Sequence, residues 1–125
     1  RGIYTIELSL TAIGEDSWIE DSVGLSGVGF HYEVIGEETY SGTQNAFISE
    51  TSASKKENGR YKISEDQTES FLIQVELNPD SNSEGEIWGI QLTKITFAKE
   101  SSGSGAFTYQ LSDKGELQTK KVIID

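Results

Sequence analysis

Residues 3–13 have the sequence IYTIELSLTAI, in which apolar and polar side chains alternate almost without interruption. Alternation with a period of two is the pattern of a β-strand that buries one face and exposes the other. The stretch is long for one arm of an isolated hairpin, so we expect it to pair within a large sheet. Its predicted inward side chains are Tyr4, Ile6, Leu8, Leu10 and Ala12.

The same alternation recurs further along the chain, in residues 28–35, 71–77 and 87–97. In the last of these segments the apolar positions change parity after Leu92. A change of parity inside one strand indicates an extra residue, so a bulge is predicted near Thr93-Lys94.

Shorter strands and turns account for the rest of the chain. Turns rich in Gly, Asn and Asp separate the segments, and the only proline, Pro79, is predicted to lie outside every strand. No segment has the period of an amphipathic helix. About seven to nine short strands predict one domain over residues 1–125, a two-sheet antiparallel β-sandwich with immunoglobulin-like Greek-key topology, with a jelly roll as the alternative. The shorter strands are predicted at 46–49, 60–64, 107–111 and 117–124.

The composition restricts the chemistry and the partners of the chain. Without cysteine, disulfides, thiolate nucleophiles and Cys-type zinc sites are excluded. A formal net charge of -11 repels phosphate backbones and anionic membranes, so we expect no nucleic-acid partner. No apolar run approaches the roughly 20 residues that span a bilayer, so we expect no membrane insertion. Frequent Ser, Thr, Gly and Asn, together with a start at Arg1-Gly2 instead of Met, predict a secreted, cell-surface protein that is processed or part of a longer chain.

Catalytic signatures are weak, and we expect a protein that is not an enzyme. The one histidine, His31, is predicted on the outward face of a strand beside Glu33, and no G-x-S-x-G motif frames a nucleophilic serine. The glycine-rich residues 24–29 lack the Lys-Ser/Thr and the following helix of a phosphate-binding loop.

Two kinds of ligand site remain as candidates. Asp80, Asn82 and Glu84 place oxygen atoms at alternate positions before a glycine, as at the start of a calcium loop. Gln91 stands where such a loop carries a bidentate Glu and no helices flank the segment, so an ordinary polar hairpin loop is favoured over the calcium loop, and no other cofactor is expected. A second, weaker acidic cluster comprises Glu15, Asp16, Glu20 and Asp21.

Aromatic side chains are the basis of a possible carbohydrate site. Trp18 lies at the edge of a loop and is the candidate for a sugar-stacking ring. Trp88 has the inward parity of its strand and is predicted to belong to the core.

The order of several segments resembles a known family of modules. These segments are GIYTI at 2–6, LSLTA at 8–12, GED at 14–16, GRY at 59–61, TESFLIQV at 68–75 and WGIQLTKITF at 88–97. Together they resemble the immunoglobulin-like β-sandwich modules in large surface proteins of candidate-phylum (Parcubacteria-like) bacteria. The resemblance extends over nearly the whole chain, implies a structural or adhesive role, and implies no catalytic residue.

The expected function is therefore a non-catalytic extracellular structural or adhesive module, part of a cell-surface stalk, surface layer or filament such as a pilus. Its expected partners are copies of itself or neighbouring modules. A terminal strand, residues 1–13 or 117–125, would complete a neighbour's sheet by strand complementation. A carbohydrate-binding module with a polysaccharide partner is the alternative. The proposed assembly strand carries Ile3, Tyr4, Ile6, Leu8 and Leu10.

Overall fold

The computed structural model describes residues 2–25, 29–36, 39–55, 57–81, 89–100, 107–110 and 121–124. The chain is all-β, as predicted, and its described residues contain no α-helix. The same described residues include one 3-10 turn, η1 (Glu57–Gly59), which precedes one of the strands. No helix in this part of the chain has the length and hydropathy that crossing a bilayer requires. The strands are β1 (Gly2–Thr11), β2 (Ser17–Glu20), β3 (Val23–Gly24), β4 (Phe30–Ile35), β5 (Gly42–Thr51), β6 (Ser54–Lys55), β7 (Arg60–Ile63), β8 (Thr68–Pro79), β9 (Gly89–Phe97), β10 (Phe107–Gln110) and β11 (Lys121–Ile124).

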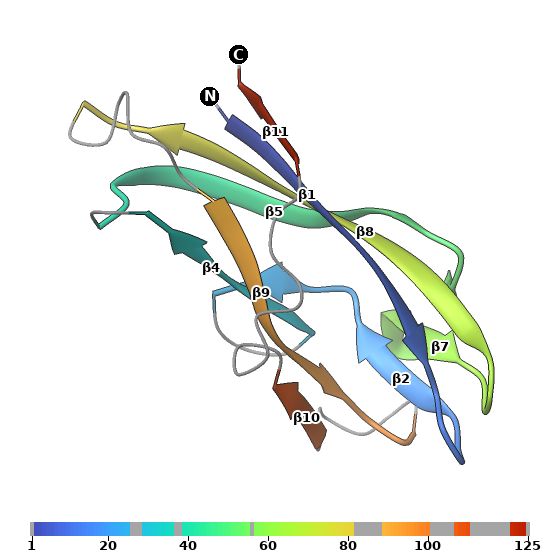
Figure 1. The fold of residues 1–125 in the computed structure, drawn as a ribbon. Helices are drawn as coiled ribbons and strands as arrows, with labels where there is room; N and C mark the ends of the chain where they lie inside the picture. The colour runs from blue at the N-terminus through green and yellow to red at the C-terminus, as the bar shows by residue number, and fades with distance from the viewer. Residues whose placement is uncertain are drawn as a thin grey trace.

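The described strands form three sheets. One four-stranded sheet has the order β11-β1-β8-β5, and a second has the order β10-β9-β4-β3. Figure 1 shows them as two layers, with β1, β5, β8 and β11 in one and β4, β9 and β10 in the other. A smaller sheet, β2-β7-β6, is joined to the end of β9 through the pairing of Trp18 with Ala98. The strand pairs are antiparallel, as predicted, except that β3 and β4 run parallel.

The first strand is an inner strand of its sheet. It pairs with β8 along its whole length, from Gly2 opposite Leu77 to Thr11 opposite Thr68, and with β11 on its other side. Alternate side chains of β1 are buried as the sequence predicts, with Leu10 at the edge of the core.

The core is built from side chains of all three sheets. The ring of Phe30 from β4 lies 5.3 Å from the ring of Phe71 from β8, and Tyr61 meets the same Phe71 edge-on at 6.0 Å. Full burial of such side chains contributes roughly 1.5–3 kcal/mol each to folding, so these contacts hold the layers together. The inward side chains of β8 are Phe71, Ile73, Val75 and Leu77, all at most 1% exposed.

Two predictions about the strands need correction. The segment predicted as a short strand at 46–49 is the ten-residue β5, because its first residues are polar and show no apolar alternation. Pro79 is not outside the strands but is the last residue of β8, opposite Gly42. A strand end tolerates the missing N–H, and Gly42 allows the close approach, because a Cβ there would lie 2.8 Å from the Pro79 Cα.

The bulge predicted near Thr93-Lys94 is confirmed. His31 pairs with Lys94 and Tyr32 with Leu92, which leaves Thr93 as the extra residue of β9. His31, predicted on an outward face, is in fact buried, with 3% exposure. Both faces of β4 are covered from Phe30 to Tyr32, so the period-two rule fails over this short stretch.

Candidate functional site

The acidic cluster predicted from the sequence lies in residues 15–21, which include β2, and we call this stretch the tied segment. Each of its acidic side chains faces a different cation on another part of the chain. The Glu15–Lys99 pair is 2.5 Å apart, Asp16–Lys62 3.5 Å, Glu20–Arg60 2.8 Å and Asp21–Lys55 2.6 Å. The carboxylates therefore do not converge on one point but connect the segment to β7, to β6 and to the chain after β9.

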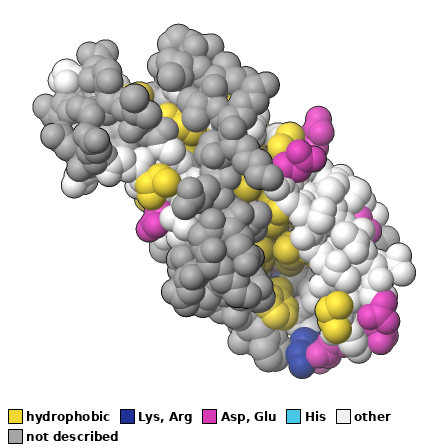
Figure 2. Space-filling view, viewed as in Figure 1, with side chains coloured by type: hydrophobic (Ala, Val, Ile, Leu, Met, Phe, Trp, Pro, Cys, Tyr) yellow, Lys and Arg dark blue, Asp and Glu magenta, His cyan; other side chains and the backbone are white. Residues whose placement is uncertain are grey.

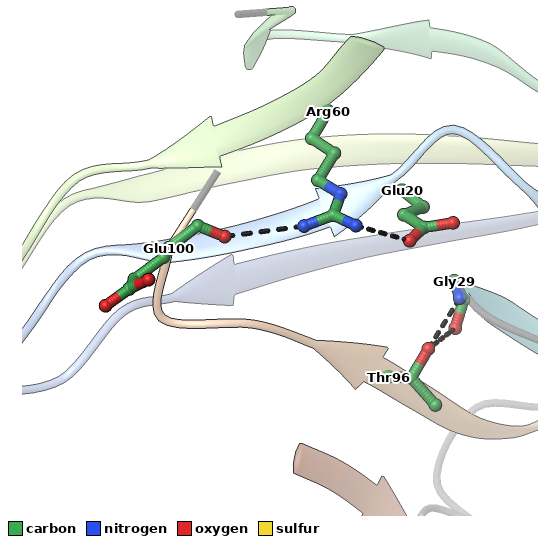
Figure 3. Close-up of polar contacts among 5 residues, drawn as sticks. All are labelled: Glu20, Gly29, Arg60, Thr96 and Glu100. Carbon is green, nitrogen blue, oxygen red and sulfur yellow. Dashed lines mark hydrogen bonds and ion pairs between the residues drawn. The ribbon is translucent and has the colours of Figure 1, made fainter. Parts of the chain in front are cut away.

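The Glu20–Arg60 pair is the least exposed of these connections. The Arg60 side chain is 11% exposed and that of Glu20 31%, whereas both partners of the other pairs are at least 31% exposed. Figure 3 shows the guanidinium between two acceptors, the Glu20 carboxylate and the Glu100 carbonyl, the second at 3.4 Å. One arginine thus links the small sheet to the chain that leaves β9.

Asp16 fixes the turn that precedes β2. Its Oδ1 accepts the Glu65 amide hydrogen at 2.8 Å, and its Oδ2 faces the Lys62 ammonium. The Glu65 hydrogen bond, assisted by the Lys62 charge, holds the pKa of the Asp16 carboxyl below its usual value. Asp16 therefore remains ionised at neutral pH and connects the turn before β2 to the turn before β8.

Trp18, the predicted carbohydrate-stacking residue, is half-buried in β2. Its backbone exchanges two hydrogen bonds with Ala98, each 2.8 Å long, which attach β2 to the end of β9. The Lys62 ammonium lies 5.3 Å from the centre of the indole ring, at cation–π distance. A sugar would therefore have to stack on the part of the ring that Lys62 leaves open. Trp88 lies outside the described residues.

Of the predicted calcium ligands, only Asp80 lies within the described residues. Its Oδ2 accepts a hydrogen bond from the Ser41 hydroxyl at 2.5 Å, and its amide donates to the Ser41 carbonyl at 3.0 Å. These bonds attach the end of β8 to the start of β5. Asn82 and Glu84 lie outside the described residues, so the calcium loop stays a prediction.

The predicted assembly residues lie on β1. Tyr4, Ile6 and Leu8 are buried against the core, while Ile3 and Leu10 are half-buried. β1 is bonded to β8 along its whole length and to β11 over residues 2–5, so both edges of its backbone are paired within the chain over those four residues.

Sequence analysis did not identify the contact between Gly29 and Thr96. The Gly29 amide donates to the Thr96 hydroxyl at 2.6 Å (Figure 3). In the backbone, the Thr96 amide donates to the Gly29 carbonyl at 2.9 Å. Gly29 has a φ of +83°, and a Cβ at this position would lie 2.4 Å from the Ser22 carbonyl oxygen. The only sequence signal for this contact is the glycine richness of residues 24–29.

Acidic side chains are more prominent than basic ones over the described part of the face in Figure 2. Among the described residues, no group of three or more His, Cys, Asp or Glu side chains lies close enough together to hold a metal ion. Comparisons with known protein families, curated proteins and solved structures find no match for this chain.

Proposed function

We propose that this chain is a non-catalytic structural or adhesive module of an extracellular, cell-surface assembly. The observation that carries the proposal is the arrangement of the tied segment, in which each carboxylate neutralises a different cation on a neighbouring element. A catalytic site directs its titratable groups toward one reacting centre. Here the charged groups are spread along a strand and form ion pairs with neighbouring elements, so we assign them a structural role.

The proposed architecture is an immunoglobulin-like Greek-key β-sandwich. The chain passes from one four-stranded sheet to the other between β4 and β5, between β8 and β9, and between β10 and β11. Connections between layers, in place of successive hairpins within one sheet, are typical of Greek-key sandwiches. The resemblance to surface modules of candidate-phylum bacteria supports the same assignment.

Assembly with copies or neighbouring modules by strand addition is part of the proposal. Donation of the first strand would require β1 to leave both β8 and β11. Gly2 lies opposite Ile124, so the two ends of the described chain leave the sheet at the same end (Figure 1).

The proposal is tested by labelling intact cells of the source organism with a membrane-impermeant amine reagent. Lys55 and Lys99, whose side chains are 48% exposed, are the expected sites of modification. Modification of these lysines before lysis supports a surface module. Modification only after lysis would contradict it.

A carbohydrate-binding module is the second candidate, favoured by the half-exposed indole of Trp18 beside a charged side chain. Its test is binding to a glycan array by the native chain and by Trp18→Ala, with Phe47→Ala as the matched control. Phe47 is an exposed aromatic residue on a different strand. Binding lost only in Trp18→Ala supports this candidate, and absence of binding to every glycan removes it.

A further inference from the structure

The strand β5 forms one edge of its sheet, beyond β8 (Figure 1). It spans ten residues, whereas the other described edge strands, β2, β3, β6, β10 and β11, span two to four residues. Edge strands carry unpaired backbone groups that another strand can complete. β5 is therefore the longest open edge in the described part of the chain.

The hydrogen bonds to β8 show which backbone groups of β5 face outward. The Asp80 amide donates to the Ser41 carbonyl, so positions 41 and 80 form a hydrogen-bonded pair. In an antiparallel ladder such pairs alternate, which directs the amides and carbonyls of residues 43, 45 and 47 toward β8. The corresponding groups of Gln44, Ala46 and Ile48 then point away from the sheet, along its open edge.

The side chains of β5 leave this edge unprotected. Natural edges are commonly blocked by lysine, by proline or by a bulge. β5 contains no Lys, Arg or Pro, and its one irregularity is the register shift between Ile48 and Glu50, near its end. Glu50 is also its only charged residue, in a chain with a formal net charge of -11. Two copies of this acidic chain can therefore approach along β5 with little local repulsion.

We propose that a second copy of this chain docks on the open edge of β5, strand to strand and antiparallel, so that the sheet continues from one copy into the other. This inference rests on the proposed function and names its partner and its surface. In a contact with two-fold symmetry, the same residues of both copies form the interface. If Ala46 of one copy lies opposite Ala46 of the other, Gln44 pairs with Ile48 of the second copy. The same register places Glu50 near the start of the second copy's β5, away from the second copy's own Glu50. The outward groups would make about six hydrogen bonds across the contact.

Sedimentation equilibrium of the whole chain, from about 10 µM to about 1 mM, tests the proposal. The native chain should form dimers, and added salt should strengthen them because it screens the repulsion between two acidic copies. Ala46→Pro removes an outward N–H without removing a bond to β8, and should weaken the dimer by about tenfold or more. Circular dichroism and urea unfolding establish that this variant is folded.

A matched pair of charge variants keeps the test decisive if Ala46→Pro does not fold. Asn45→Glu adds a negative charge on β5, and Ser9→Glu adds the same charge on β1, on the other side of β8 from β5, at a position that is also exposed. The first should weaken the dimer and the second should leave it unchanged. A chain that remains monomeric throughout, a dimer weakened by salt, or a dimer equally stable in Asn45→Glu and Ser9→Glu would overturn the assignment of β5. In the last case only the assignment of β5 fails, because the chain still self-associates. The labelling of intact cells then tests the proposed surface function separately.

Discussion

If the ion pairs of the tied segment hold its neighbouring elements together, the least exposed pair, Glu20–Arg60, should contribute more to stability than a more exposed one. The perturbation is a pair of substitutions, Arg60→Met and Glu20→Gln, made singly and together. The matched control is the same double-mutant cycle at Lys55→Met and Asp21→Asn, an ion pair formed by the same segment. Each cycle yields the coupling free energy between its two side chains, separate from what each side chain does alone.

The expected magnitudes follow from the geometry. The Glu20–Arg60 pair is 2.8 Å apart with side chains 31% and 11% exposed, and Arg60 has a second acceptor in the Glu100 carbonyl. A charge-assisted hydrogen bond contributes about 1.5–3 kcal/mol, and the partial exposure of Glu20 places the expected coupling near the lower end, at about 1–1.5 kcal/mol. The Lys55–Asp21 pair, 48% and 38% exposed, belongs to the exposed class, for which a much weaker coupling is expected.

Urea unfolding at neutral pH measures the free energy of unfolding for each variant, at low ionic strength and again in high salt. Salt should reduce the Lys55–Asp21 coupling to near zero and leave most of the Glu20–Arg60 coupling in place. Equal couplings for the two pairs, or a Glu20–Arg60 coupling that also disappears in salt, would show that burial does not set the strength of these connections.

Three further substitutions or additions test other parts of the structure. Gly29→Ala should cost about 2–3 kcal/mol in urea unfolding, because it combines a positive φ with a Cβ 2.4 Å from the Ser22 carbonyl oxygen. Gly14→Ala is its control, with a φ of +82° but nothing within 4 Å of the added Cβ, and should cost only about 1–2 kcal/mol; equal losses would refute the steric explanation. Because the pKa of Asp16 is lower in the folded chain than in the unfolded chain, its stabilisation is complete above the unfolded pKa of about 3.9 and is lost as the pH falls through the folded pKa. Asp16→Asn should therefore reduce the free energy of unfolding at neutral pH and make it fall less steeply as the pH is lowered. A variant whose free energy of unfolding falls in acid as steeply as that of the native chain would contradict this. If Asp80 helps to bind calcium, the melting temperature must rise with added Ca²⁺ and fall with a chelator, and an unchanged melting temperature removes that site.

The sequence predicted the strands whose buried faces are apolar. In β1 and β8 the inward positions are filled by large aliphatic and aromatic side chains, so the period of two is visible without the structure. The extra residue Thr93 could be placed because Ile95 and Leu92 both had to be inward. β5 was recognised only in part, because an edge strand buries little and its first residues, such as Thr43 and Asn45, are exposed and polar.

The candidate site was less predictable. The acidic residues of the tied segment were evident, but their cations belong to other parts of the chain that only the topology brings beside it. The burial of His31 was also hidden, since a polar residue at an alternating position predicts an exposed face. The need for glycine at position 29 was hidden as well. It follows from the nearby Ser22 carbonyl oxygen and from the hydrogen bond to Thr96, and the sequence alone does not place either group beside Gly29.

Residue-resolved amide hydrogen exchange of the native chain, at low and at high protein concentration, tests most directly the claim that this module associates through the open edge of β5. The amides of residues 43, 45 and 47 face β8 and should be protected at both concentrations. The amides of Gln44, Ala46 and Ile48 should exchange freely in dilute solution and become protected as the concentration rises. If these three amides exchange equally fast at both concentrations while the chain sediments as a dimer, the contact lies elsewhere and the claim is wrong.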